Sequence, residues 1–397
     1  MADIDIPSWP RFEEDEIAAV VRVLESGRVN QWTGPEVTEF ESEWAAVSCC
    51  QHAFAMANGT VALEAAIRAL RLDASGEVIV PARTHVSTGM AVAIAGARPV
   101  FADVDSRTGC VTVESLEAAR TSQTVVAIVV HIGGWVADIV AIQAWAKANG
   151  IVIVEDAAQA HGATRHDAMG NTRWAGTFGQ FGSWSFCQDK IVSTGGEGGM
   201  LGVADLELAD RVWSLRDHGR CRRKVESHIP SNQFAWSAES LGSNLRMTCL
   251  QAAIGKVQLT KLDGWIAARS RNAKILAERL SVIDWLELPV CEPDHHPAWY
   301  RVYAMVRSDA KHACSRRDGV LHAVSEIGLP IGVGSCPEIY RESALREWAP
   351  SDRCANAQSL GERCLCFPCH HLITPQAMQA FADRIVEACR LVDAKYI

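Results

Sequence analysis

The sequence has no long basic run, and acidic residues outnumber basic ones. Its longest basic stretch is Arg220-Cys-Arg-Arg-Lys224, and 38 lysines and arginines stand against 47 aspartates and glutamates, for a formal net charge of −9. Proteins that bind nucleic acid mainly through the phosphate backbone need a basic surface. The composition therefore argues against nucleic acid as the main partner.

The sequence also has no pattern typical of a membrane span or an export signal. Its longest apolar region, residues 124–146, is interrupted by His131, two glycines and Asp138. A helix that spans a bilayer needs about 20 mostly apolar residues in succession. The first residues lack the charged and then apolar segments of a signal peptide. We therefore expect a cytoplasmic protein with no membrane partner.

Cysteine, in contrast, is abundant, with 14 residues scattered along a chain of 397. In a chain of this size, scattered cysteines are typical of reduced thiols in a cytosolic enzyme. One cluster, Cys364, Cys366, Cys369, His370 and His371, leaves a zinc site as an alternative. Zinc needs four converging nitrogen or sulfur ligands, and no second well-spaced pair is present. We therefore expect structural thiols and no metal.

Predicted strands and helices alternate along the first part of the chain. Runs of β-branched residues predict buried parallel strands, and apolar residues at helical spacing predict helices between them. The expected strands cover residues 52–57, 77–81, 97–105, 125–131 and 151–156, and the expected helices cover 12–26, from 36, from 59, 140–149 and 244–280. This order predicts an α/β fold, with a large, doubly wound, mostly parallel sheet domain over residues 1–250. A smaller α+β domain is expected over 251–397.

The first of these helices follows an acidic turn. Ile17, Val20, Val21 and Leu24 recur there at helical spacing and are predicted to form its apolar face. The helix is therefore expected to be amphipathic.

A lysine and an aspartate stand out as candidate catalytic residues. Lys190 ends the mostly apolar stretch Ser183-Trp-Ser-Phe-Cys-Gln-Asp-Lys190, and Asp156 ends the strand-like run Ile151-Val-Ile-Val-Glu-Asp156. A desolvated lysine is a nucleophilic amine able to form a Schiff base, although many such lysines are ordinary surface residues. A carboxylate at the end of a parallel strand can keep a pyridinium nitrogen protonated, which makes pyridoxal phosphate an electron sink. This order of aspartate and lysine is expected in fold-type I enzymes that use pyridoxal phosphate.

A candidate phosphate site lies earlier in the chain, at Asn58-Gly59-Thr60. Glycine followed by threonine at a helix N-terminus offers free backbone N–H groups, a hydroxyl and the positive end of the helix dipole. An ordinary N-cap is the more common use of such a segment. The residues alone leave both interpretations open.

Several stretches resemble one known family in the same order along the chain. Ile153-Val-Glu-Asp-Ala-Ala-Gln-Ala-His-Gly-Ala163, Phe181-Gly-Ser-Trp-Ser-Phe-Cys-Gln-Asp-Lys190 and Glu197-Gly-Gly199 resemble the signature of DegT/StrS sugar aminotransferases. Gly242-Ser-Asn-Leu-Arg-Met resembles a further stretch of the family. The chain has one residue more in the glycine run after Lys190, and His85 stands where many members have a larger aromatic residue.

The resemblance implies a role for each matching residue. Lys190 would form the Schiff base and later move a proton, and Asp156 would pair with the pyridine nitrogen of pyridoxal 5'-phosphate. Gln159 would bind the ring hydroxyl and His85 would stack on the ring, although a helix-capping histidine is the alternative. The implied phosphate ligands are Gly59, Thr60 and Ser185, with Ser183 as a second candidate and Asn244 contributed by the other subunit of a homodimer.

The resemblance also implies the reaction, in which the pyridoxamine form of the cofactor is an intermediate. Glutamate or glutamine would donate an amino group to a keto sugar, expected to be nucleotide-linked. Gly334-Ser-Cys-Pro-Glu-Ile-Tyr340 resembles a loop of surface-polysaccharide members, which favours lipopolysaccharide or other surface-glycan biosynthesis. A keto-cyclitol or keto-octulosonate acceptor remains open, as does a dehydratase or aromatising reaction, since some lysine-containing members lose water.

Overall fold

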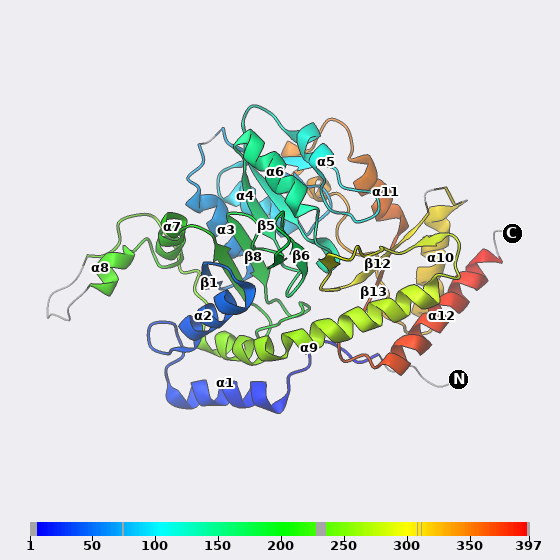
Figure 1. Cartoon of the computed structure of the whole chain (residues 1–397), viewed down its shortest axis with the longest axis horizontal. Helices are drawn as coiled ribbons and strands as arrows, with labels where there is room; N and C mark the ends of the chain where they lie inside the picture. The colour runs from blue at the N-terminus through cyan, green and yellow to red at the C-terminus, as the bar shows by residue number, and fades with distance from the viewer. Residues whose placement is uncertain (1–5, 74, 228–235, 308, 311, 395–397) are drawn as a thin grey trace.

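A computed structural model describes residues 6–73, 75–227, 236–307, 309–310 and 312–394 (Figure 1). Its helices are α1 (Glu14–Ser26), α2 (Glu36–Ser48), α3 (Gly59–Ala69), α4 (Val86–Ile94), α5 (Val113–Ala119), α6 (Ile139–Asn149), α7 (Leu206–Arg216), α8 (Arg222–Glu226), α9 (Cys249–Leu280), α10 (Ala313–Glu326), α11 (Ala355–Arg363) and α12 (Pro375–Asp393). Its strands are β1 (His52–Met56), β2 (Glu77–Pro81), β3 (Arg98–Ala102), β4 (Thr124–Val130), β5 (Val152–Asp156), β6 (Thr164–His166), β7 (Thr172–Trp174), β8 (Phe181–Ser185), β9 (Gly199–Val203), β10 (Leu286–Glu287), β11 (His295–His296), β12 (Val302–Val306) and β13 (Cys364–Phe367). Short 3-10 turns lie at Ile132–Gly134, Ile339–Arg341 and Arg346–Trp348. None of the described helices combines the length and hydropathy needed to cross a bilayer.

The large sheet has the strand order β1-β9-β8-β5-β4-β2-β3. Strands β8, β5, β4, β2 and β3 are parallel to one another, and β9 runs antiparallel to both β8 and β1. The residues of β2, β8 and β9 are all buried, as expected for strands covered on both faces. The predicted α/β fold with a mostly parallel large sheet is confirmed.

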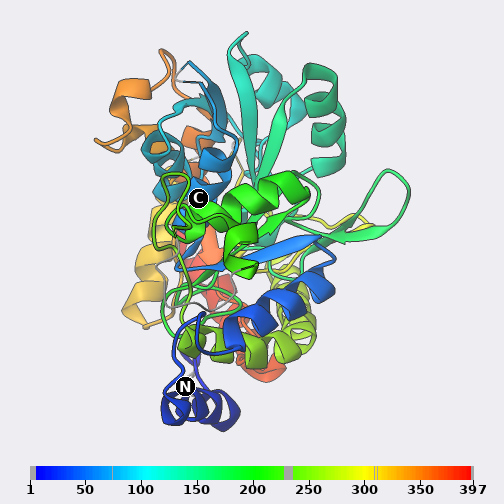
Figure 2. The ribbon, with the colours of Figure 1, turned by 90° about the vertical axis from the view of Figure 1, so that its left-hand side faces the viewer.

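The connecting helices pack as two groups. Helix α3 contacts both α4 and α7, whereas α5 and α6 contact each other. Figure 2 shows the sheet between helices, and it shows the hairpin of β6 and β7 projecting from the body. The connections after parallel strands must cross the sheet, so they place helices over its faces and leave the carboxyl ends of the strands at one edge.

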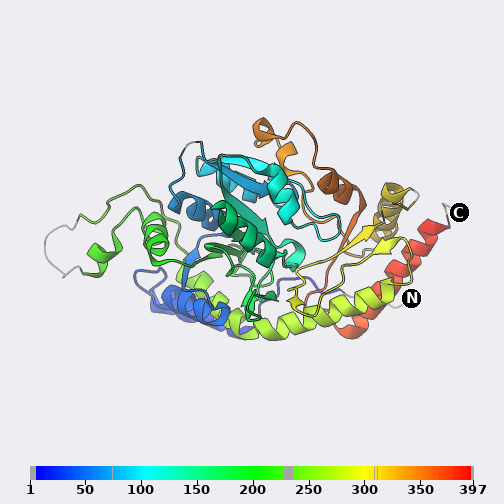
Figure 3. The ribbon, with the colours of Figure 1, turned by 45° about the horizontal axis from the view of Figure 1, so that its top comes forward.

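Helix α9 joins two hydrophobic cores. Leu259 and Leu262, in its first half, belong to the core around the large sheet. Leu276 and Leu280, near its end, belong to a second core with the antiparallel sheet β10-β12-β13 and helix α12. Figure 3 shows α9 running beneath both parts. The domain boundary after residue 250 stays a prediction.

The long helix begins later than its apolar pattern predicted. Thr248 is its N-cap, because the Thr248 hydroxyl accepts a hydrogen bond from the Gln251 backbone and the Gln251 side chain accepts one from the Thr248 backbone. This reciprocal cap satisfies backbone donors that the first turn leaves free. The helix therefore starts at Cys249, five residues after Asn244.

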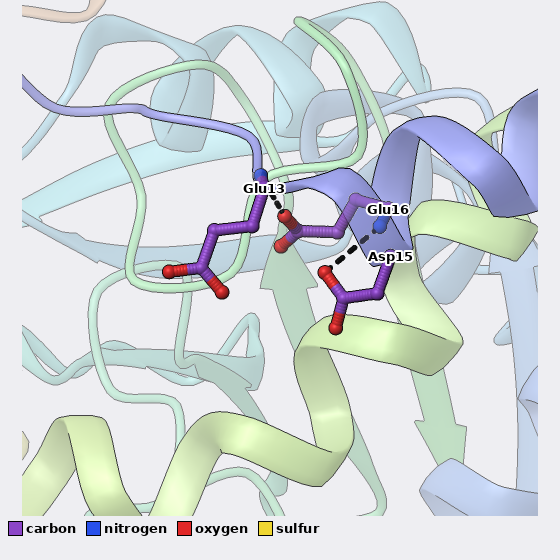
Figure 4. Close-up of side chains that lie close together, drawn as sticks. All are labelled: Glu13, Asp15 and Glu16. Atoms are coloured by element: carbon purple, nitrogen blue, oxygen red, sulfur yellow. Dashed lines mark hydrogen bonds between the residues drawn. The ribbon is translucent and has the colours of Figure 1, made fainter.

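Helix α1 is present where predicted, but the face that was predicted to be apolar points outward. Ile17, Val21 and Leu24 are 55%, 43% and 56% exposed, whereas Ala19 and Val23 are buried. Charge also helps to hold the helix against α9. Lys261 Nζ lies 2.8 Å from carboxylate oxygens of both Glu13 and Asp15 and 3.5 Å from Glu16. Figure 4 shows these three acidic side chains gathered at the start of α1.

Candidate active site

Asp156 lies at the carboxyl end of β5, where the strand leaves the sheet. Its side chain is 6% exposed, and it pairs in register with Ser183 of β8. Asp156 Oδ2 accepts a hydrogen bond of 2.9 Å from Thr88 Oγ1, and Oδ1 accepts one of 3.2 Å from the Ala158 backbone. These contacts hold the carboxylate in one orientation at the sheet edge where open α/β proteins bind ligands.

Lys190 lies in the turn that follows β8, and its side chain is only 15% exposed. Lys190 Nζ is 3.6 Å from Asp189 Oδ1 and 4.9 Å from the ring centroid of Tyr300. The Tyr300 hydroxyl donates a hydrogen bond to the other oxygen of Asp189. Burial acts to raise the pKa of Asp189, but Lys190 and the Tyr300 hydroxyl outweigh it and hold that pKa below its ordinary value.

Lys190 opens into a cavity of about 470 Å³ that also contains two other predicted site residues. Gln159 and His85 line it with Lys190, and the loop over residues 330–336 closes one side. Gln159 Oε1 accepts a hydrogen bond of 2.6 Å from the Gly133 backbone, which orients the amide. The structure thus brings Lys190, Gln159 and His85 together.

His85 caps a helix and also lines the cavity around Lys190. Its Nδ1 accepts a hydrogen bond of 3.3 Å from the Ser87 backbone and lies 2.8 Å from the Ser87 hydroxyl, so the residue caps α4. The same residue lines the cavity beside Lys190. Stacking of its ring on a cofactor stays a prediction.

The start of α3 forms a cradle against β8. Asn58 caps the helix by accepting a hydrogen bond of 3.0 Å from Val61, so the donors of the first turn, at Gly59 and Thr60, are left for another acceptor. A Cβ on Gly59 would lie 2.7 Å from Ser185 Cβ, too close for any larger residue. Glycine is therefore required where the helix start meets Ser185. This close approach fits an anion such as phosphate.

The two serines of β8 differ in their contacts. Ser183 Oγ is buried and donates a hydrogen bond of 3.3 Å to the Gly59 carbonyl. Ser185 Oγ accepts a weak hydrogen bond of 3.4 Å from the Cys187 backbone, and a Cβ on Gly59 would lie 3.2 Å from it. The Ser185 hydroxyl therefore faces the start of α3, and its O–H remains free to donate a hydrogen bond to a ligand.

Asn244 lies apart from these residues. It is exposed, and its backbone forms an isolated bridge with Asp217. It does not line the cavity around Lys190. Its predicted role requires a second subunit and therefore stays a prediction.

His161 is a buried residue that holds the backbone of Ser185. Its Nε2 donates a hydrogen bond of 2.9 Å to the Ser185 carbonyl. Burial lowers the pKa of His161 to about 3, and the nearby Lys190 charge acts in the same direction. The imidazole is therefore neutral near pH 7, so it adds no positive charge beside the lysine.

Several residues of this site were not predicted from the sequence. Thr88 follows β2 and reaches Asp156, and Tyr300, far along the chain, reaches Asp189. Trp9 Nε1 donates a hydrogen bond of 2.6 Å to the Lys190 carbonyl and so fixes the turn that carries the lysine. Only Thr88, a hydroxyl in the first turn of the helix that follows the predicted strand 77–81, left a local signal that could have been used.

The cysteine and histidine cluster near the C-terminus does not form a metal site in the part of the chain that the structure describes. Cys364 Sγ contacts Arg83, and Cys369 Sγ contacts the Trp299 carbonyl. Among the described residues, the one group of three acidic, histidine or cysteine ligands that converges is the cluster at the start of α1, and Lys261 pairs with its carboxylates. The zinc alternative therefore gains no support.

The chain is similar to a sugar transaminase, to an aminohydroxybenzoate synthase and to an aminotransferase of known structure. It is 33% identical to dTDP-3-amino-3,4,6-trideoxy-alpha-D-glucose transaminase of Streptomyces venezuelae, covering 96% of this chain and 92% of that protein. It is 30% identical to 3-amino-5-hydroxybenzoate synthase of Amycolatopsis mediterranei, covering 97% of both. The crystal structure of an aminotransferase from Psychrobacter cryohalolentis, 37% identical, superposes with a TM-score of 0.93 over 98% of this chain and 100% of the other.

The model of the DegT/DnrJ/EryC1/StrS aminotransferase family matches residues 10–387. The predicted fold-type I architecture, the pyridoxal phosphate cofactor and the assignment as a sugar aminotransferase are thereby confirmed at the level of the family. The chain belongs to the DegT/DnrJ/EryC1/StrS aminotransferase family.

Proposed function

We propose that this protein transfers an amino group from L-glutamate or L-glutamine to a nucleotide-linked keto sugar. The observation that carries the proposal is the placement of Lys190, Gln159 and His85 around one cavity at the edge of the sheet where Asp156 ends β5. The transaminase of Streptomyces venezuelae, by its name, makes an amino sugar carried on dTDP, which supports this class of acceptor.

The residues present fit pyridoxal phosphate. The donors at Gly59 and Thr60 and the Ser185 hydroxyl would hold its phosphate, since the glycine lets the helix start approach Ser185 closely. Asp156 would hold the ring nitrogen and Gln159 the ring hydroxyl. When bound, the cofactor supplies an electron sink for the carbon that loses or gains a proton.

The chain's own groups supply the proton transfer. Lys190 supplies the amine that lines the cavity. An amine held in position can move a proton to or from the substrate carbon and so accelerate the reaction. Asp189 and the Tyr300 ring hold its ammonium form beside the cavity, so the side chain has a defined resting place when it carries the proton. Thr88 keeps the Asp156 carboxylate oriented. Because Thr88 and Asp156 are both buried, water is excluded from the contact between them.

The oligomeric state, the pathway and the cellular location are each proposed from a different observation. The exposed apolar residues Ile17, Val21 and Leu24 of α1 support burial against a second copy, and a homodimer would let the exposed Asn244 reach the partner's phosphate site. The loop that begins at Gly334 supports a role in lipopolysaccharide or other surface-glycan synthesis. Fourteen unpaired thiols support a cytoplasmic location.

The test of the proposed function is amino transfer from the donor alone. Protein loaded with pyridoxal phosphate should form one equivalent of 2-oxoglutarate from L-glutamate and lose its visible absorbance, and Lys190→Ala should do neither. Lys147→Ala, which changes an exposed lysine of α6, is the matched control and should behave as the wild type. A wild-type protein that binds the cofactor but never releases 2-oxoglutarate or its glutamine counterpart would contradict the proposal.

An aromatising dehydratase is the second candidate, because one relative is named 3-amino-5-hydroxybenzoate synthase. That reaction removes water from a cyclic substrate and needs no net consumption of an amino donor. Stoichiometric loss of glutamate with each product formed would favour the aminotransferase. Formation of an aromatic product without loss of glutamate would favour the dehydratase.

A further inference from the structure

Most arginines that the structure buries have an obvious partner. Arg216 forms an ion pair with Glu41 and contacts the Ala55 carbonyl, and Arg269 donates to two backbone carbonyls. Arg83 and Arg301 are different, because neither guanidinium has a carboxylate within 4.0 Å or a hydrogen bond to an oxygen among the described residues, and Arg83 donates instead to Cys364 Sγ. A guanidinium removed from water without a counterion is costly, so the fully buried Arg83 requires an explanation, and Arg301 adds a second, half-buried guanidinium near the same cavity.

Arg301 lies on the wall of the cavity that contains Lys190 and Gln159. It precedes β12, is half-buried, and its Cζ lies 5.2 Å from the Tyr300 ring centroid. Asp189 is the carboxylate among the residues that line this cavity; its charge attracts Arg301, but its direct contacts are with the Tyr300 hydroxyl and Lys190. The Arg301 guanidinium is therefore held in place by an aromatic ring while its N–H donors remain available to a ligand.

Arg83 places a second positive charge next to the residues that line this cavity. It is fully buried, and its Nε and Nη1 have no hydrogen-bond partner among the residues that the structure describes. Its Cζ lies 5.4 Å from the ring centroid of Tyr303, which lines the cavity. A Cβ on the cavity residue Gly334 would come within 3.2 Å of Arg83 Nη2, so the guanidinium lies directly beneath that loop. Its positive charge favours binding of a negatively charged group in the cavity.

We infer that Arg301 binds a carboxylate of the substrate, in a cavity that Arg83 makes electropositive. A planar guanidinium matches a carboxylate with two parallel hydrogen bonds. This inference rests on the proposed function and narrows its substrates. The carboxylate belongs either to the amino donor or to an acidic keto sugar, and Arg301 sets specificity for whichever carries it.

Direct binding measurements test the inference without turnover. Glutarate represents the donor, D-glucuronate represents an acidic sugar, and D-glucose is the neutral control. Each is titrated calorimetrically into the cofactor-loaded wild type and into Arg301→Gln, Arg301→Lys and Arg307→Gln. Arg307 is an exposed, ion-paired arginine at the other end of β12 and serves as the matched control.

The Kd of glutarate, of glucuronate or of both should rise about 10- to 100-fold in Arg301→Gln. Arg301→Lys should retain part of the affinity, Arg307→Gln should equal the wild type, and any binding of glucose should not change. Weaker binding of glutarate to Arg301→Gln would assign the carboxylate to the amino donor. Weaker binding of glucuronate would assign it to the acceptor.

Equal affinities in the wild type and Arg301→Gln would overturn the inference, as would a wild type that binds neither acid. Kinetics separate this failure from that of the proposed function. If the wild type forms 2-oxoglutarate from glutamate and Arg301→Gln has the same KM for both substrates, the function stands and the inference fails. If the wild type forms neither 2-oxoglutarate from glutamate nor the corresponding keto acid from glutamine, the proposed function fails whatever the calorimetry gives.

Discussion

Two neighbouring carboxylates on β5 are used in different ways. Glu155 is fully buried, and its Oε1 accepts backbone hydrogen bonds of 2.6 Å from both Phe178 and Gly179. Its Oε2 accepts one of 2.8 Å from Gly176 and lies 2.9 Å from His131 Nε2. Every acceptor position of this side chain is therefore occupied within the protein.

Asp156, the next residue, points to the opposite side of the strand, and within the described part of the chain it has only two such contacts, with Thr88 and Ala158. The comparison teaches that a buried charge with a complete set of partners holds the fold together. A carboxylate with fewer partners at the strand end has capacity left for a ligand.

Asp156→Asn should produce the largest effect, on chemistry and not on folding. We expect kcat for amino transfer to fall by about 10²- to 10³-fold, because the variant removes a charge placed to stabilise the reacting ring. The free energy of unfolding, measured in urea without cofactor, should change by less than about 1 kcal/mol, since only two contacts are altered. The exposed Asp263→Asn is the control, and equal losses in both variants would contradict the assignment.

Glu155→Gln should produce the opposite pattern. Its amide would present a donor to backbone N–H groups and to His131, so we expect a loss of about 2–4 kcal/mol in the free energy of unfolding. The folded fraction should still bind pyridoxal phosphate and accept an amino group from glutamate. A variant as stable as the wild type would show that the Glu155 contacts do not hold this edge of the sheet.

The dependence of stability on pH should reveal His161. Burial depresses the pKa of His161 to about 3 in the folded protein, below the ordinary value of the unfolded chain. The unfolded state therefore binds the extra proton between those values, and stability falls as the pH drops below about 6, by up to ~1.4 kcal/mol per pH unit. His161→Gln should remove one proton's share of this slope in chemical denaturation series, and an unchanged slope would show that the residue is not buried neutral.

Thr88→Val should have the smallest effect of the four. It removes the hydroxyl that orients Asp156 but keeps the shape of the side chain, so kcat/KM should fall about tenfold, as for one hydrogen bond to a charged group. Thr260→Val, on the exposed side of α9, is the control. A loss as large as that of Asp156→Asn would mean that Thr88 itself contacts the reacting groups.

Much of the site could be predicted because its parts lie at the ends of predicted strands and helices. Asp156 ends a β-branched run and Gly59 begins a helix, and both are where the pattern placed them. The partners of Lys190 could not be predicted, because the contact of Tyr300 with Asp189 joins segments 111 residues apart. Periodicity indicated the helix α1 but not which of its faces is buried. The spacing of apolar residues cannot distinguish a face that packs within the chain from one that is left exposed.

The identity of the lysine that binds the cofactor is the central claim. The protein is loaded with pyridoxal phosphate, reduced with borohydride to fix any Schiff base, digested, and mapped by mass spectrometry. We predict a single pyridoxyl group on the peptide that contains Lys190, lost in Lys190→Ala and retained in Lys147→Ala. A modification on another lysine, or none after loading, would contradict this claim.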